Sequence, residues 1–157
     1  MTVDNLMKQA ISQAKMAQKL NEVPVGAVIA KDGEIISIAH NERDKNMQAA
    51  DHAEMLAIRR ACKKLKSWRL TGCDIFVTLE PCPMCAGAII TARIQNVYFG
   101  CYDKKSGAFG GVVDFSTFKW PHKPNIYGGF FGYLKCPVIL PFQLSRQFSS
   151  RGAGPIL

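Results

Sequence analysis

Residues 74–92 read Asp-Ile-Phe-Val-Thr-Leu-Glu-Pro-Cys-Pro-Met-Cys-Ala-Gly-Ala-Ile-Ile-Thr-Ala. The first six residues are rich in β-branched and aromatic side chains, which predicts a strand over 74–79. Pro83 suits the first turn of a helix, and the almost wholly apolar run 86–92 predicts that this helix is buried. The stretch is therefore a strand that leads directly into a helix, with two cysteines at the junction.

The chain on either side of this stretch predicts further helices and strands. Towards the N-terminus, apolar residues recur at helical spacing, and a valine-rich region contains the tight-turn sequence Lys-Asp-Gly. The expected elements are an amphipathic helix from Asp4 or Asn5 to about Leu20, a β-hairpin over 23–40, a polar loop over 44–51, a second helix that begins at His52, and a strand over 96–101.

These elements predict an α/β fold. Strand–helix–strand alternation implies a parallel portion of sheet, and the hairpin adds an antiparallel portion, so we expect a mixed sheet with helices on both faces. The chain of 157 residues suits one domain, and it contains no internal repeat and no linker. We therefore expect a single domain over 1–157. Its C-terminal part, 132–157, is atypical because Pro137 and Pro141 interrupt an apolar run there.

Four residues in two motifs predict a metal site. Cys82 and Cys85 are neighbours on one helical face at i and i+3, and His52 and Glu54 open the preceding helix. Residues two apart lie about 200° apart on a regular helix, so His52 and Glu54 can converge only in its first turn. One imidazole and two thiolates supply three ligands for a tetrahedral zinc ion and leave a fourth position open, as in catalytic zinc sites. Glu54 is then free to move protons.

Other interpretations of these motifs remain open at this point. A Cys-x-x-Cys pair near a strand and helix is also typical of thioredoxin-like redox sites, although such a site gives no role to the histidine and the glutamate. A structural zinc site would need a fourth protein ligand. His40, His122 or Cys101 could supply that ligand, so the number of ligands alone does not exclude it.

Composition and charge narrow the class of protein. With 48% hydrophobic and 20% charged residues, the chain belongs among globular proteins, and no apolar run is long enough to span a membrane. The first residues lack the pattern of a secretory signal, so we expect a reduced, cytoplasmic protein. Of the net charge of +8, +6 lies after Asp103. This charge suits a polyanionic partner such as nucleic acid, or a solvated basic surface.

An aromatic cluster follows in the same basic region. Phe115, Phe118 and Trp120 are interleaved with Lys119 and Lys123. Such rings can stack on the bases of single-stranded nucleic acid. Packing in a core or a subunit interface is the commoner use of aromatic side chains.

Beyond these local patterns, the chain resembles the cytidine deaminase-like superfamily and, within it, the bacterial tRNA-specific adenosine deaminases. The order His-x-Glu … Pro-Cys-x-x-Cys, from His52 to Cys85, is the signature of the zinc deaminases. The resemblance extends from about Leu6 to Asp114. The stretches that carry it are Glu22-Val-Pro-Val-Gly-Ala-Val, His40-Asn41, His52-Ala-Glu, Ser67-Trp-Arg-Leu, Val77-Thr-Leu-Glu-Pro-Cys-Pro-Met-Cys-Ala-Gly-Ala, Arg93-Ile and Phe99-Gly-Cys-Tyr-Asp103.

The resemblance implies a three-layer α/β/α sandwich on a five-stranded sheet, a homodimer, and one zinc ion per chain held by His52, Cys82 and Cys85. It implies hydrolytic deamination of adenosine to inosine at the wobble position of a tRNA anticodon loop, with release of ammonia and with Glu54 as the catalytic proton carrier. The substrate-binding residues that it implies are Asn41, Asp103, Phe142 and Arg146.

Some features leave other functions open. Ala50 and Asp51 stand where the family usually has threonine and alanine, and Asp51 is a candidate cap for the helix that follows. Phe142 and Arg146 keep the four-residue spacing of the family's RNA-contacting pair, but prolines lie close to them. The alternatives are a guanine, cytosine or nucleoside deaminase that acts on a small molecule, and a non-catalytic zinc-binding module.

Overall fold

The computed structural model describes residues 1–131. The elements in chain order are α1 (Val3–Lys19), β1 (Gly26–Lys31), β2 (Glu34–His40), α2 (Arg43–Asn46), α3 (Ala53–Leu65), β3 (Cys73–Leu79), α4 (Pro83–Thr91), β4 (Asn96–Cys101), the 3-10 helix η1 (Phe115–Thr117) and β5 (Asn125–Gly128). The helices and strands expected from the sequence are confirmed. Within this part of the chain, no helix combines the length and apolarity needed to cross a membrane.

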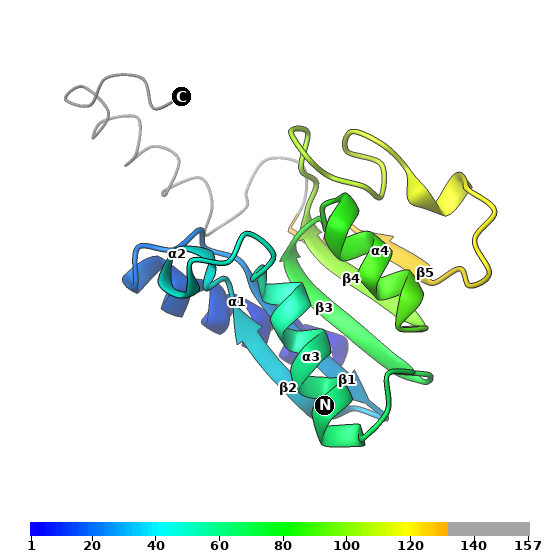
Figure 1. Ribbon diagram of the computed structural model, residues 1–157, viewed down its shortest axis with the longest axis horizontal. Coiled ribbons are helices and arrows are strands. Elements are labelled where there is room, and N and C mark those ends of the chain that lie inside the picture. The colour runs from blue at the N-terminus through cyan, green and yellow to red at the C-terminus, as the bar shows by residue number, and fades with distance from the viewer. Residues whose placement is uncertain (132–157) are drawn as a thin grey trace.

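The five strands form one mixed sheet in the order β2-β1-β3-β4-β5. Strand β1 is antiparallel to β2 and to β3, whereas β3, β4 and β5 run parallel to one another. The carboxyl ends of parallel strands meet at one edge of a sheet, where the loops that follow them lie together. The segment after β3 and the loop after β4 are therefore brought to the same edge (Figure 1).

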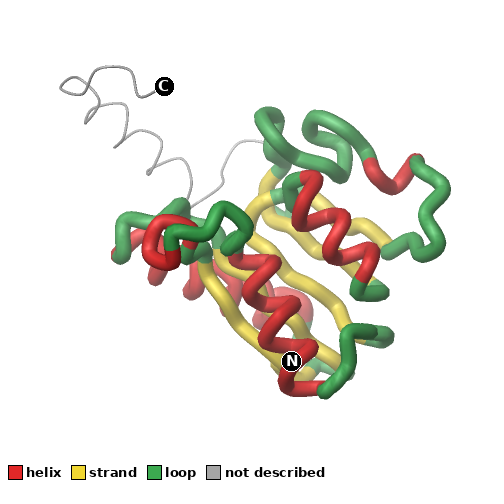
Figure 2. The backbone as a smooth tube through the Cα atoms, viewed as in Figure 1, coloured by secondary structure: helices red, strands yellow, loops and turns green. Residues whose placement is uncertain are grey.

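Helices cover both faces of the sheet, as expected. Helix α1 lies on one face, and α3 and α4 lie side by side on the other (Figures 1 and 2). Successive side chains of β1 point to opposite faces, so Val28 packs under α1 while Ala27 and Ile29 pack under α3 and α4. The result is a three-layer α/β/α sandwich on a mixed five-stranded sheet, as expected.

Three short elements were not found from residue patterns, namely α2, η1 and β5. Helix α2 lies in the segment that was expected to be a loop. It forms because the Glu22 carboxylate accepts hydrogen bonds from the backbone N–H groups of Asp44 (3.2 Å) and Lys45 (2.7 Å), and such bonds satisfy the unpaired donors of a first helical turn. Strand β5 is short and largely exposed. The Tyr127 ring stacks on Tyr98, with ring centroids 4.8 Å apart, which supports β5 against β4.

The contact between α1 and the start of β1 leads to a stability prediction. A Cβ atom at Gly26 would overlap the carbonyl oxygen of Ala10 and approach the backbone nitrogen of Ala14 to 2.6 Å. We expect Gly26→Ala to push α1 away from the sheet and to lower the free energy of unfolding by about 1–3 kcal/mol, the usual cost of overpacking. Urea denaturation measures this change. A variant as stable as the parent protein would contradict the close contact.

Candidate active site

Two helix N-termini meet beside the carboxyl end of β3. His52 is the N-cap residue of α3 and Cys82 is the N-cap residue of α4, and both have extended backbone conformations. Neither side chain makes a capping hydrogen bond to its own helix, so both are free to point into the space between the helices. The backbone N–H groups and the positive ends of the two helix dipoles favour negative charge there. The expectation that His52 and Glu54 lie at the first turn of a helix is confirmed.

The three expected metal ligands lie together. Nδ1 of His52 is 3.6 Å from Sγ of Cys82 and 3.6 Å from Sγ of Cys85, and all three donor atoms lie within 4.8 Å of one another. A tetrahedral zinc ion with ordinary Zn–N and Zn–S bonds separates its ligand atoms by about 3.5–3.8 Å. The observed spacing and the donor set of one imidazole and two sulfurs therefore fit zinc.

A fourth protein ligand is not found among residues 1–131, where His52, Cys82 and Cys85 form the single cluster suited to a metal ion. Nδ1 of His40 lies 3.1 Å from the Asn41 carbonyl oxygen, and Nε2 of His122 lies 2.6 Å from the Ile94 carbonyl oxygen. None of His40, His122 and Cys101 belongs to the cluster, so three ligands with one side left open match a catalytic zinc site rather than a structural one.

Neighbouring groups and burial shift the pKa values of the titratable side chains in the site. The neighbouring Cys85 thiol and the His52 ring lower the pKa of Cys82 to about 4, and contact with Cys82 together with burial raises the pKa of Cys85. The hydrogen bond to Cys82 raises the pKa of His52. Burial raises the pKa of the Glu54 carboxyl to about 7. The Cys82 sulfur is therefore an anionic donor that suits a cation, and the Glu54 carboxyl beside it can exchange protons near neutral pH.

A pocket of about 200 Å³ opens onto these groups. The structure brings Asn41, His52, Glu54, Cys82 and Asp103 to its wall, whereas Cys85 is buried beneath it. Sequence reasoning missed the other lining residues, which are Val23, Val25, Arg43, Ala53, Leu79, Glu80 and Ser106. The predicted residues Phe142 and Arg146 lie outside the described residues.

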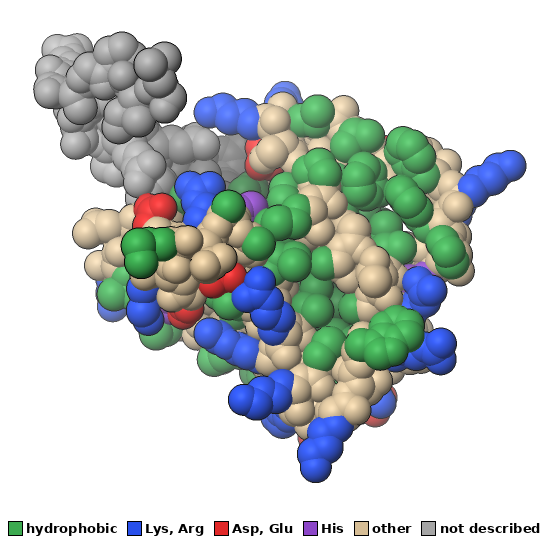
Figure 3. Space-filling view, viewed as in Figure 1, with side chains coloured by type: hydrophobic (Ala, Val, Ile, Leu, Met, Phe, Trp, Pro, Cys, Tyr) green, Lys and Arg blue, Asp and Glu red, His purple; other side chains and the backbone are tan. Residues whose placement is uncertain are grey.

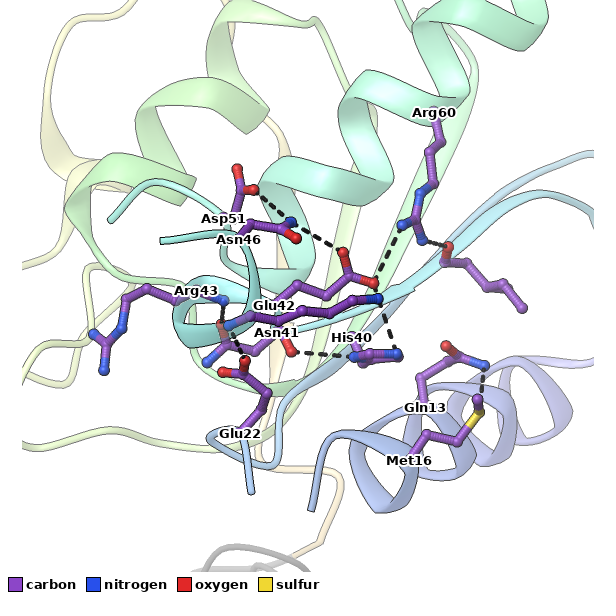
Figure 4. Close-up of polar contacts among 12 residues, drawn as sticks. Gln13, Met16, Glu22, His40, Asn41, Glu42, Arg43, Asn46, Asp51 and Arg60 are labelled. Carbon is purple, nitrogen blue, oxygen red and sulfur yellow. Dashed lines mark hydrogen bonds and ion pairs between the residues drawn. The ribbon is translucent and has the colours of Figure 1, made fainter. Parts of the chain in front are cut away.

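The Asn41 side chain is held in place by the turn that follows it. Its Oδ1 accepts a hydrogen bond of 3.0 Å from the backbone N–H of Arg43. The same turn is held by Glu22, whose carboxylate points to it from the loop between α1 and β1 (Figure 4). Asn41 is 4% exposed. An amide that is both buried and oriented in this way is suited to recognising a polar ligand group.

The expectation that Asp51 caps the following helix is wrong. The N-cap of α3 is His52, and Asp51 instead bridges two other residues. Its Oδ1 accepts from Arg59 at 2.7 Å and its Oδ2 accepts from Asn46 at 2.8 Å. Hydrogen bonds from Asn46 and Arg59 lower the pKa of Asp51. The acid beside the metal ligand therefore joins the end of α2 to the middle of α3, a contact that the local sequence does not show.

The aromatic cluster of Phe115, Phe118 and Trp120 packs mainly on itself. The ring centroids of each pair lie 5.7 Å apart. Phe115 rests against the core, but Phe118 and Trp120 remain 46% and 38% exposed. The cluster is therefore partly a core contact and partly a surface.

Comparison with known proteins identifies the family to which this chain is similar. The family model of MafB19-like deaminases matches residues 1–135. A tRNA-specific adenosine deaminase of Bacillus subtilis is 47% identical over 131 residues, covering 82% of this chain and 81% of that protein. A tRNA-specific adenosine deaminase of Aquifex aeolicus is 48% identical over 120 residues, covering 76% of each chain.

Solved structures resemble this chain to different degrees. A structure from a study of A-to-I editing by tRNA:A34 deaminases at the wobble position superposes with a TM-score of 0.78 and 41% identity, covering 80% of this chain and 92% of that chain. A guanine deaminase of Bacillus subtilis superposes with a TM-score of 0.63 and 27% identity, covering 98% of this chain and 99% of that chain. Similarity is thus greater to the tRNA-editing structure than to the guanine deaminase.

Proposed function

Because the chain belongs to the MafB19-like deaminase family and, within it, to the tRNA-specific adenosine deaminases, we propose that it hydrolyses adenosine to inosine and ammonia at the wobble position of a tRNA anticodon loop. The observation that carries this function is the cluster of His52, Cys82 and Cys85 at zinc-ligand spacing beside Glu54 in one pocket. We further propose that residues 1–157 form one deaminase domain, which the family match over 1–135 supports.

The roles of the site residues follow from their positions. His52, Cys82 and Cys85 would hold the zinc ion, which as a Lewis acid lowers the pKa of water to about 7. Glu54 projects from the first turn of α3 into the same pocket. It accepts the two protons of the attacking water in turn, and delivers one to the purine ring nitrogen and the other to the amino group that leaves C6 as ammonia. Water and adenosine are thereby consumed, and inosine and ammonia are formed.

Two further pocket residues are suited to binding the nucleotide. Asn41 presents a fixed side-chain amide that can hydrogen-bond the flipped base. Asp103, from the loop after β4, presents a carboxylate that can accept from a ribose hydroxyl. We also assign RNA contacts to Phe142 and Arg146, from their spacing in the sequence alone.

The exposed surface around α4 supports a homodimer. Hydrophobic side chains gather over α4 and over the loop that follows β4 (Figure 3). Met84, Val112, Phe118 and Trp120 are 38–59% exposed, and contiguous exposed apolar side chains are typical of protein interfaces. A reducing compartment such as the cytoplasm suits a site that needs two free thiols.

An ammonia-release assay tests the substrate. We expect the zinc-loaded protein to release ammonia from an anticodon stem-loop with adenosine at the wobble position, and not from a matched stem-loop with guanosine there, nor from free adenosine, guanine or cytosine. Release from guanine but not from the stem-loop would replace this function by that of a guanine deaminase. The absence of release from every substrate would indicate a non-catalytic zinc-binding module.

A further inference from the structure

Glu80 is a buried acid in the active-site region that the proposed mechanism does not use. It directly follows β3 and is 2% exposed. Its backbone N–H donates to the Cys101 carbonyl at 2.8 Å, which continues the pairing of β3 with β4 and fixes where the side chain begins. Among residues 1–131, no lysine, arginine or histidine lies within ion-pair distance of its carboxylate.

The loop of residues 103–111 encloses the Glu80 carboxylate. The backbone N–H of Gly111 donates to Oε2 at 3.1 Å. A Cβ atom at Gly107 or at Gly111 would overlap this same oxygen. Two glycines therefore allow the backbone to approach the carboxylate closely. The loop is folded around the Glu80 side chain.

The same loop carries Asp103 and Ser106 into the pocket. Ser106 Oγ donates to Oδ2 of Asp103 at 2.8 Å, and the backbone N–H of Lys105 donates to Oδ1 at 2.9 Å. The carbonyl oxygen of Asp103 accepts from the N–H of Gly107 at 2.9 Å. The turn that orients Asp103 is thus continuous with the glycine that contacts Glu80.

Fold stability alone does not account for an acid at this position. The second oxygen of Glu80, Oε1, is buried and has no hydrogen-bond partner among the described residues, where it is the single side-chain oxygen or nitrogen in that state. A buried carboxylate with one unpaired oxygen is costly, and replacing buried charges by neutral groups of similar shape is often neutral or stabilising. The presence of an acid at position 80 is better explained by the loop 103–111, which its carboxylate holds in place.

We propose that Glu80 is a positioning residue for substrate binding, which holds the loop 103–111 so that Asp103 and Ser106 face the pocket. Glu80 acts through the backbone of this loop, to which its carboxylate is hydrogen-bonded. The inference rests on the proposed function, since that function assigns Asp103 to the ribose.

Glu80→Leu tests this role with a side chain of similar size that cannot accept a hydrogen bond, whereas the carbonyl oxygen of a glutamine could still accept from the Gly111 N–H. We expect the KM for the anticodon stem-loop to rise about 10- to 100-fold in Glu80→Leu, as for the loss of one hydrogen bond to a charged group, while kcat changes less than about threefold and zinc content stays at that of the parent protein. A fall in Tm with equal losses in kcat, zinc content and substrate binding would indicate a general structural role and would overturn the proposal.

A double-mutant comparison identifies the route of the effect. If Glu80 acts through Asp103, then Glu80→Leu should add little to the effect of Asp103→Asn, because coupled residues are not additive. Combined with Asn41→Ala, which changes a pocket residue outside the loop 103–111, the same substitution should be additive. Additivity with Asp103→Asn, or an unchanged KM in Glu80→Leu, would contradict the proposal.

Hydrogen–deuterium exchange separates this inference from the proposed function. We expect the backbone amides of residues 103–111 to exchange faster in Glu80→Leu than in the parent protein, whereas those of α1 stay unchanged. Unchanged exchange of the loop would overturn the inference whatever the substrate. A parent protein that shows the expected exchange but does not deaminate the stem-loop would contradict the proposed function alone.

Discussion

Replacement of Glu54 by alanine is expected to lower kcat on the anticodon stem-loop by about 10²–10⁴, the usual contribution of general acid–base catalysis. The carboxylate is 4% exposed in the first turn of α3 and lines the pocket next to the metal ligands. Among the acids that line the pocket, Glu80 and Asp103 are bound by the loop 103–111. Neither is therefore placed to take over proton transfer when Glu54 is removed.

Single-turnover measurement of inosine formation checks this prediction. Glu54→Gln should be as inactive as Glu54→Ala, since the amide keeps the size of the side chain but cannot carry the proton. Glu34→Ala, which removes an exposed acid from β2, should keep the parent activity. Because Glu54 is not among the three ligands, both Glu54 variants should retain zinc. Activity that survives in a zinc-loaded Glu54→Ala variant would exclude the proton-carrier role.

Removal of the metal is the second change with a large expected effect. The purified protein should contain about one zinc ion per chain, and a chelator should abolish ammonia release until zinc is added back. A Lewis acid contributes several kcal/mol to the transition state, so we expect a loss of at least about 10³-fold. Cys85→Ser should lose both zinc and activity, because its sulfur is one of three donors within 4.8 Å of one another.

The matched control for the cysteine substitution is Cys62→Ser. Cys62 lies on α3 away from the cluster, with its sulfur 3.8 Å from the carbonyl oxygen of Trp68. It should keep both zinc and activity. Metal content is measured by atomic emission on the intact protein. Full activity in metal-free protein would contradict the assignment of the whole site.

Much of the site could be predicted from the sequence because its parts are local. The i, i+3 spacing of Cys82 and Cys85 follows from helix geometry once a helix begins at Pro83. The first-turn position of His52 and Glu54 follows from where the second helix begins. The mixed sheet followed from the order of its elements, and the fifth strand was implied by family resemblance, since its own residues carry little pattern.

Other features were wrong or missed because they depend on distant contacts. Asp51 looked like a helix cap in the sequence, but Arg59 and Asn46 bind both of its oxygens. Helix α2 looked like a loop because its stabilising acid, Glu22, lies 23 residues before the N–H of Lys45 that it accepts from.

By itself, the sequence predicted the candidate metal ligands, the candidate proton carrier and the class of fold, because helix spacing and strand pattern act over a few neighbouring residues. Only the tertiary structure decided how the pocket is completed. The parallel pairing of β3 with β4 brings Glu80 against the loop 103–111 and makes a hydrogen bond across 31 residues to Gly111. Such a contact is set by the packing of the whole sheet, and no local pattern of residues specifies it.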